Sequence, residues 1–296
     1  MSIAKVNAVA VDGIAEVNNL SRSTQISQIN NIDIGSSFST DFSLDLNGSS
    51  QYATLGDLSS TVLEPSQSSI NTSGFTFTSW VYIDSLSSGE YIYNIGQSGT
   101  NNYYGFKVVV NNNGALVFHV MGLNGSTAGS GSNNRNTTRT ANSTIAAGQW
   151  YHLAIVVPAG SMGSTQDRDS WLIYINGSAY SGTYTRSGNQ NVVLSYNGSS
   201  SLGAWTRASV GNYFDGELNN LAVFSTGLDA NNIAAIYNSG APIDLSSNSG
   251  NYTQSGNLIA WWRFNEGSGT SYTDSTSNGF TGTGVGTPTY STNVPT

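Results

Sequence analysis

Short runs of alternating residues, separated by turn-forming residues, constrain this chain more than any other feature. The longest run, residues 75–83, is built mainly of aromatic and β-branched side chains, which is typical of a strand. The turn Asn111-Asn112-Asn113-Gly114 predicts a hairpin between two such runs. The expected strands are residues 75–83, 90–95, 104–110, 115–120, 149–157, 171–175, 191–195 and 218–224. This pattern predicts an all-β fold, with long polar loops over 124–148 and 158–170.

One short helix is expected in this all-β chain, over residues 228–237. Asp229 is a suitable N-cap, and the apolar residues Ile233, Ile236 and Tyr237 share one face of the helix. The full length of 296 residues is enough for one large β-sandwich. No apolar run of about 18 residues and no secretion signal are evident, so neither a membrane-spanning helix nor a signal peptide is expected.

Composition excludes several classes of function. The chain has no cysteine, which rules out disulfides, zinc–thiolate sites and cysteine nucleophiles. Only 9% of its residues are charged, the net charge is −8, and Lys5 and Lys107 are the only lysines. Nucleic-acid binding needs clustered Lys and Arg to displace phosphate counterions, so this charge balance argues against it.

Residues 1–34 differ from the rest because they contain three related units of the form Ile-Ala/Ser-x-Val/Ile-Asn. A repeat this short cannot bury its own apolar side chains, so it is expected to pack on the sandwich, a sister chain or another protein. We therefore expect an assembly arm over 1–34 and a sandwich over 35–296. The alternative is a flexible tail, and the secondary structure of the arm stays open. The expected assembly positions are Ile3, Val6, Ile14, Val17, Ile26 and Ile29.

Several segments resemble motifs of laminin-G-like or concanavalin A-like lectin/glucanase domains. Residues 258–286, which begin LIAWWRFNEGSG, resemble the opening of such a domain, and residues 42–52 (FSLDLNGSSQY) resemble its usual next strand. Because the opening motif closes this chain, the order is that of a circular permutation, which surface termini tolerate. Further matches are residues 75–81, 148–154, 172–177 and 214–224. The resemblance implies a two-sheet jelly-roll sandwich over 42–286, with 258–286 beside 42–52.

A second resemblance concerns the two ends of the chain. The units of residues 1–34 and the ending PTYSTNVP over 288–295 resemble virion structural proteins of tailed phages, notably cyanophages. This resemblance implies a non-enzymatic protein on the virion exterior, made in the host cytoplasm. It would be a capsid decoration or cement protein, or a fibre component, whose arm docks on the major capsid protein or the fibre shaft. A homo-oligomer, for example a trimer, is expected.

A carbohydrate-binding adhesin that recognises host-surface glycans is the first alternative. Such a protein needs aromatic platforms beside hydrogen-bonding side chains, and the expected loops offer four aromatic residues. These are Tyr103, Tyr104, Trp205 and Tyr213. The other tryptophans fall in expected strands. Trp261 and Trp262 are adjacent and so point to opposite faces, which predicts that one of them is exposed or covered by another chain.

A glycoside hydrolase is the second alternative, and we expect no such activity. Glycosidases need two suitably spaced carboxylates, and the glucanase strand motif Glu-x-Asp-x-x-Glu is absent from the sequence. Asp215 and Glu217 share one face of a strand, but an acidic pair in solvent on an edge strand explains them far better than a catalytic pair does. The only histidines are His119 and His152, and no Gly-x-Ser-x-Gly elbow is present to form a serine nucleophile.

Calcium is the one metal for which the sequence offers candidate ligands. Ca²⁺ takes six to eight oxygen ligands, and candidate donors are Asp57, Glu266, Asp274 and Asn278. The alternative is that these side chains cap their own loop backbones as Asx turns. Because few carboxylates converge, we expect that folding does not require calcium, and no other cofactor is expected.

Overall fold

In the computed structural model the chain divides into two compact units, Met1–Ser39 and Thr40–Thr296. The structure describes residues 16–17, 20–21, 28–29, 32–33, 38–58, 60–61, 63, 68–86, 89–95, 105–124, 135–162, 166–188, 192–193, 200–206 and 210–296. No helix within these ranges has the length and apolar character needed to cross a membrane.

The first unit contains two small antiparallel hairpins. In one, β1 (Glu16–Val17) pairs with β2 (Leu20–Ser21), and in the other β3 (Gln28–Ile29) pairs with β4 (Ile32–Asp33). The two strand pairs overlap two of the three repeat units, residues 14–20 and 26–32. The expected assembly residues Ile3, Val6, Ile14 and Ile26 lie outside the described residues, so the assembly contacts stay a prediction.

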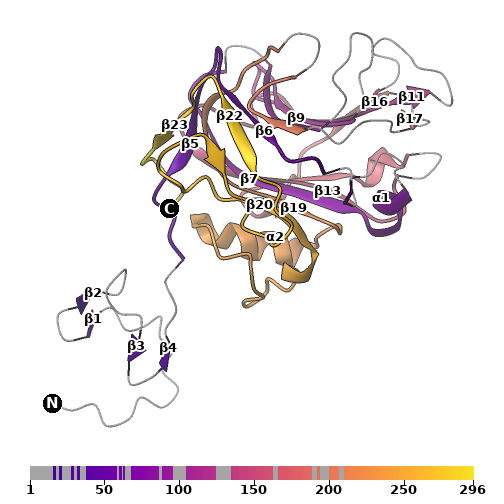
Figure 1. Ribbon diagram of the computed structural model, residues 1–296. Helices are drawn as coiled ribbons and strands as arrows, with labels where there is room; N and C mark the ends of the chain where they lie inside the picture. The colour runs from indigo at the N-terminus through magenta and orange to yellow at the C-terminus, as the bar shows by residue number, and fades with distance from the viewer. Residues whose placement is uncertain are drawn as a thin grey trace. The chain divides into compact units, whose positions relative to one another are not determined.

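The second unit is a sandwich of two antiparallel sheets, as predicted (Figure 1). The larger sheet has nine strands in the order β16-β12-β10-β9-β8-β18-β6-β22-β21. The bounds of these strands are β6 (Tyr52–Leu55), β8 (Glu90–Ile95), β9 (Gly105–Val110), β10 (Leu116–Met121), β12 (Arg135–Arg139), β16 (Thr185–Gly188), β18 (Ser200–Leu202), β21 (Ser271–Tyr272) and β22 (Gly282–Val285).

The smaller sheet has eight strands in the order β15-β14-β13-β7-β19-β5-β23, with β20 also paired to β19. The bounds of these strands are β5 (Ser43–Asn47), β7 (Phe75–Ile83), β13 (Trp150–Val157), β14 (Leu172–Ile175), β15 (Ser178–Ala179), β19 (Asp215–Phe224), β20 (Leu258–Trp262) and β23 (Thr289–Ser291). A separate short pair joins β11 (Leu123–Asn124) to β17 (Val192–Val193).

Within the described residues, two α-helices accompany the sheets, α1 (Ser68–Ser73) and α2 (Ala230–Tyr237). The sequence predicted α2 and its N-cap: the Asp229 carboxylate accepts a hydrogen bond from the backbone N–H of Asn232 at 2.8 Å. Figure 1 shows α2 against the side of the smaller sheet that faces away from β6 and β9. Helix α1 was not predicted.

The sandwich core lies between the two sheets. Phe77 of β7 stacks on Tyr93 of β8, with ring centroids 4.8 Å apart, so the contact crosses from one sheet to the other. In the same way, Phe118 of β10 meets the edge of Trp171, which precedes β14, at 5.4 Å. Each fully buried side chain of this size stabilises the fold by about 1.5–3 kcal/mol.

The last strands of the chain extend both sheets, and they pair with β5 and β6, which are the first strands of the sandwich. Strand β22 pairs with β6, placing Thr283 opposite Thr54, and β23 pairs with β5. The side-chain oxygen of Asn265 accepts hydrogen bonds from the backbone N–H groups of Asp41 and Phe42, at 2.7 and 2.8 Å. The predicted neighbourhood of residues 258–286 and 42–52 is therefore confirmed.

Two predictions about local structure are wrong. Both adjacent tryptophans are buried within one chain: Trp261 is 3% exposed and Trp262 is 0% exposed. Trp262 faces the core, while the indole N–H of Trp261 donates to the Asn220 side chain at 2.9 Å, on the opposite side of β20. The expected loop over 124–148 also contains strand β12, whose Asn136 and Thr138 are fully buried.

Candidate functional site

A row of eight polar residues crosses the outward face of the larger sheet, one residue from each of eight neighbouring strands. We call this set the polar row: Thr283, Thr54, Ser201, Asn94, Lys107, His119, Thr137 and Ser187. Successive residues of a strand point to opposite faces, and Phe106, Val108 and Phe118, which adjoin row residues in the sequence, pack in the core. The row contains no carboxylate, although the chain as a whole is acidic.

The middle of the polar row holds a surface segment in place. The Ser201 hydroxyl donates to the carbonyl of Ala204 and contacts the Thr206 hydroxyl, both at 3.0 Å, and the Asn94 amide donates to Ser201 at 3.3 Å. Beyond this anchor, Trp205 and Gly211 exchange backbone hydrogen bonds of 2.9 and 3.1 Å. The buried polar residues of the row therefore fix the position of Trp205 over the sheet.

Trp205 is a half-buried ring with a neighbour on the sheet and a cation near it. It stacks on Tyr91 of β8, with centroids 5.6 Å apart and planes within 8° of parallel. The Lys107 ammonium lies 5.0 Å from the centroid of the Trp205 ring, within the range of a cation–π interaction. Lys107 is only 3% exposed, so its charge is sheltered from water beside the ring. These contacts hold the ring in one orientation.

His119 and Arg135 continue this site toward β12. The His119 imidazole Nδ1 lies 2.9 Å from the Thr137 hydroxyl. Burial, with the positive charges of Arg135 and Lys107 adding to it, lowers the pKa of His119 to about 3, so the imidazole is neutral at pH 7. Arg135 is half-buried, and within the described residues its guanidinium has no hydrogen bond or ion pair. We call Trp205, Lys107, His119 and Arg135 the cationic platform.

Two of the four aromatic residues predicted for glycan binding fall on this part of the fold. Trp205 belongs to the cationic platform, and Tyr213 follows in the same segment and packs on Tyr52 of β6 at 6.4 Å. Tyr103 and Tyr104 lie outside the described residues.

Sequence reasoning missed Lys107 and Arg135 of the cationic platform, and it missed Tyr91, on which Trp205 stacks. The predicted hairpin held a usable signal, because a turn at 111–114 aligns Lys107 with His119 on the face opposite the core. The loop wrongly expected over 124–148 concealed Arg135. No comparable local signal connects Trp205 with Lys107, which lie far apart in the sequence.

Asp274, one of the expected calcium ligands, is engaged by protein donors. Its carboxylate accepts hydrogen bonds from the backbone N–H groups of Trp261, Thr276 and Phe280, at 3.0, 2.9 and 3.0 Å. The Thr276 hydroxyl donates to the same carboxylate at 2.8 Å. Asp274 thus organises the loop that follows β20 by satisfying its backbone donors.

The other three candidate calcium ligands do not join Asp274 in one cluster. Glu266 accepts hydrogen bonds from the backbone of Thr273 at 2.9 Å and from the Tyr290 hydroxyl at 3.2 Å. Asn278 donates to a backbone carbonyl of β20 at 2.9 Å, and Asp57 is exposed beyond β6. Within the described part of the chain, no three His, Asp or Glu side chains are placed to hold a metal ion.

The acidic pair Asp215 and Glu217 lies on the smaller sheet, away from the polar row. The Asp215 carboxylate accepts a hydrogen bond from Ser85 at 2.6 Å. Glu217 accepts one from the Asn293 amide at 2.7 Å, and burial is the main cause that raises the pKa of its carboxyl. Both side chains therefore bind neighbouring parts of their own chain.

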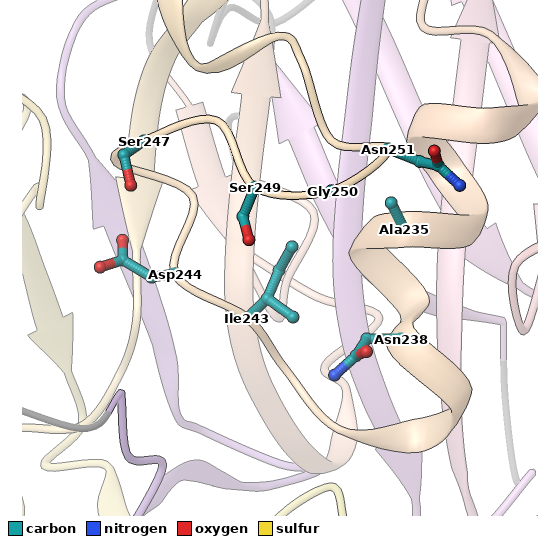
Figure 2. A pocket seen from close by; sticks show the side chains of 8 residues that line it. All are labelled: Ala235, Asn238, Ile243, Asp244, Ser247, Ser249, Gly250 and Asn251. Atoms are coloured by element: carbon teal, nitrogen blue, oxygen red, sulfur yellow. The ribbon is translucent and has the colours of Figure 1, made fainter. Parts of the chain in front are cut away.

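A hollow of about 450 Å³ lies beside the end of α2. Its lining is polar apart from Ala235, Ile243 and Gly250, and it includes the carboxylate of Asp244 (Figure 2). Figure 2 shows one loop along the upper side of the hollow and the last turn of α2 along another. The full lining is Ala235, Asn238, Ile243, Asp244, Ser247, Ser249, Gly250 and Asn251.

Comparison with solved structures shows similar folds at low sequence identity. A Bacteroides ovatus protein provisionally described as carbohydrate-binding is 16% identical with a TM-score of 0.54, over 87% of this chain and 62% of that one. The CBM40 of Ruminococcus gnavus IT-sialidase, bound to α2,3-sialyllactose, is 14% identical with a TM-score of 0.46, over 66% and 96%. A heptameric SAP-like pentraxin of Limulus polyphemus is 16% identical with a TM-score of 0.42, over 67% and 82%.

Comparison with families is more decisive. No curated protein matches the sequence. The model of the concanavalin A-like lectin/glucanases superfamily matches residues 47–234, which is more than half of the chain. The match spans strands of both sheets and includes the cationic platform. The chain therefore belongs to the concanavalin A-like lectin/glucanases superfamily.

Proposed function

We propose that the sandwich is a non-enzymatic glycan-binding module whose ligand carries an acidic group. The observation that carries this proposal is the cationic platform, where a fixed indole ring lies beside the Lys107 ammonium, and where His119 is near both Lys107 and Arg135, whose guanidinium has no partner among the described residues. Membership of a superfamily that includes lectins supports it. The structural similarity to the B. ovatus protein, provisionally described as carbohydrate-binding, agrees with it.

Trp205 supplies the stacking surface in this proposal. A pyranose ring presents an apolar face of C–H groups, and aromatic rings contribute a large contact area to such a face. Because Tyr91 supports the ring from the sheet, little freedom is lost when a ligand binds. Such preorganisation favours affinity by reducing the entropy cost of binding.

Arg135 and Lys107 supply the charge selectivity. A guanidinium matches the geometry of a carboxylate or sulfate with two parallel hydrogen bonds, and charge-assisted bonds of this kind are the stronger ones. Arg135 is available for such a pair because no described protein group engages it. Neutral His119 adds a hydrogen-bonding group without a second buried charge.

The net charge of −8 opposes an acidic ligand at long range. Exposed charges farther away than about 8 Å are largely screened at physiological ionic strength, whereas close and partly buried contacts are screened much less. The proposal therefore expects acidic glycans to bind better at physiological salt than at very low salt, over the range where repulsion dominates.

A panel of acidic and neutral oligosaccharides tests this function with the full chain. Wild-type protein should bind acidic members, and Trp205→Ala and Arg135→Gln should each weaken binding at least tenfold. Trp150→Ala and Arg186→Gln are matched controls, because Trp150 is half-buried on the smaller sheet and Arg186 already donates to the carbonyl of Asp169 at 3.0 Å. Equal losses in the controls, or binding of neutral glycans alone, would contradict the proposal.

A role on the exterior of a phage virion is a second candidate, favoured by the first unit. Met1–Ser39 forms a compact unit of its own, and the sequence repeats fall within it. We propose that this arm attaches the sandwich to a capsid or a fibre, as an oligomer. Deleting residues 1–34 should leave a folded sandwich that no longer joins particles. Wild-type occupancy of the deletion protein would contradict this role.

A further inference from the structure

We propose that the hollow beside α2 is a second saccharide site, which takes a neutral sugar unit. The hollow lies on the outer side of the smaller sheet, whereas the cationic platform lies on the outward face of the larger sheet. The two sites would face opposite sides of the sandwich. This inference does not rest on the acidic-glycan proposal, because it uses different residues and a different ligand chemistry.

The walls of the hollow are held by buried contacts on either side of the exposed loop. Leu245 is buried, and the hydroxyl of buried Tyr252 donates to its carbonyl at 2.9 Å. Ser249 and Tyr252 exchange two backbone hydrogen bonds of 2.9 Å. Next to them, Tyr252 meets the edge of Phe224 in β19 at 6.3 Å. The loop is therefore anchored on the sheet, so its shape exists before a ligand arrives.

The end of α2 forms the opposite wall. Asn238 caps the helix in a left-handed conformation (φ 44°, ψ 46°), and its N–H bonds to the carbonyl of Ala234. Its side-chain N–H₂ donates to the carbonyl of Ala241 at 3.2 Å, which leaves the amide oxygen as an acceptor. Figure 2 shows Ile243 between this wall and the loop of Ser249, where it offers an apolar contact.

Several lining groups have no partner in the described structure. The side chains of Ser247, Ser249 and Asn251 make no hydrogen bond there. Asp244 accepts one bond, from the backbone N–H of Ser246 at 2.8 Å, through only one of its two oxygens. Hydroxyl, amide and carboxylate groups that line a hollow together with an apolar contact suit a ring with several hydroxyl groups.

The charge of the lining selects against acidic ligands. Asp244 is its one ionisable side chain, and none of the eight lining residues is cationic. The end of α2 adds the partial negative charge that helix C-termini carry. A neutral sugar can donate hydroxyl protons to Asp244, whereas the carboxylate of a uronate would be repelled by it, a repulsion that Arg263, which interacts electrostatically with Asp244, only partly offsets. The hollow thus favours neutral sugars, whereas the cationic platform favours acidic ones.

The size of the hollow matches one sugar unit with part of its neighbour. At about 450 Å³ it lies in the range of small-molecule sites. It is open to solvent on one side, so a single unit should bind weakly, with a Kd on the order of 1 mM or above. Weak binding of this kind becomes effective when a longer glycan or an oligomer engages several sites together.

Ligand-observed NMR on the full chain tests this inference with methyl glycosides of glucose, galactose and mannose, and with glucuronate. At least one neutral glycoside should bind wild-type protein. The double substitution Ser247→Ala/Ser249→Ala should weaken that binding roughly tenfold, because two hydrogen bonds are lost. Ser246→Ala is the matched control, since Ser246 lies in the same loop outside the lining, and it should bind as wild type does.

Two further variants separate this site from the cationic platform. Trp205→Ala should keep neutral binding unchanged, and Asp244→Asn should reduce the preference for neutral glycosides over glucuronate. The inference is wrong if none of the three neutral glycosides binds, or if binding survives Ser247→Ala/Ser249→Ala. Loss of neutral binding in Trp205→Ala would also overturn it, by moving that ligand to the cationic platform.

Discussion

The outward faces of the two sheets differ in what covers them. On the smaller sheet, Trp80 and His152 are 3% and 1% exposed, because Tyr237 of α2 lies over them, with its ring 5.7 Å from that of Trp80. On the larger sheet, the corresponding layer is the polar row, and Trp205 and Arg135 are half-buried above and beside it.

This difference separates stability from recognition. An aromatic sheet face left in water is unfavourable, so the chain covers it with its own helix. On the larger sheet the middle of the polar row is buried, with Ser201 at 1% and Lys107 at 3% exposure, so the half-buried Trp205 and Arg135 are the groups that remain available to a ligand. Substitutions on the helix-covered face should therefore change the free energy of unfolding, and those on the polar face should change binding.

The largest expected effect is that of Trp80→Ala. Removing this buried ring leaves a cavity beneath α2 and should lower the free energy of unfolding by about 3–5 kcal/mol. Urea denaturation followed by circular dichroism measures it, and binding of acidic glycans by the remaining folded protein should be unchanged. A loss below about 1 kcal/mol would show that α2 does not seal this face.

Acid should weaken the helix-covered face through His152. Neither ring nitrogen of His152 has a hydrogen-bond partner among the described residues, and burial lowers its pKa from 6.5 to about 3. Because the unfolded chain binds this proton more readily, stability is complete above pH 6.5 and declines as the pH falls toward 3. The loss should reach about 2 kcal/mol by pH 5.

The pKa of His119 is lowered as well, so both histidines contribute to this pH dependence of stability. The matched variants His152→Phe and His119→Gln separate the two contributions. Each variant should show a smaller slope of unfolding free energy between pH 7 and pH 5 than the wild type. A His152→Phe protein with the full wild-type slope would show that His152 does not contribute.

Trp205→Ala should have a smaller effect on stability than Trp80→Ala. The half-buried ring loses its stack on Tyr91 and its contact with Lys107, each worth about 0.5–1.5 kcal/mol. Urea denaturation beside Trp80→Ala compares the two directly. Equal losses from both substitutions would remove the distinction between a structural face and a binding face.

Chelation should have the smallest effect. Since Asp274 already accepts bonds from the backbone of Trp261, Thr276 and Phe280, a calcium chelator should leave the Tm unchanged. Asp274→Asn, by contrast, should lower the Tm, because a charged acceptor of several backbone donors is replaced. A fall of many degrees on chelation would show that a metal binds in the wild-type protein.

Local patterns predicted much of the fold. Strand β7 begins and ends where its alternation does, and α2 begins after the N-cap Asp229. The same local patterns failed to predict β12, because its buried side chains are polar and its Arg-Asn-Thr-Thr-Arg sequence has no apolar alternation. They also failed at Trp261, whose buried indole N–H donates to Asn220, 41 residues away in the sequence.

The candidate site was predictable only in part, for a physical reason. Trp205 could be chosen as an aromatic residue in a loop, and a single hairpin register aligns Lys107 with His119. The complete polar row depends on seven strand pairings, several of which join distant segments. Such non-local registers are set by packing of the whole sandwich, which no single window of sequence contains.

The most direct measurement is a structure of the full chain with the acidic glycan that binds best on the panel. The glycan should lie on the outward face of the larger sheet, with a sugar ring on Trp205 and its acidic group at Arg135. An acidic glycan seated beside α2, or a panel without any acidic binder, would contradict the assignment of recognition to the polar face.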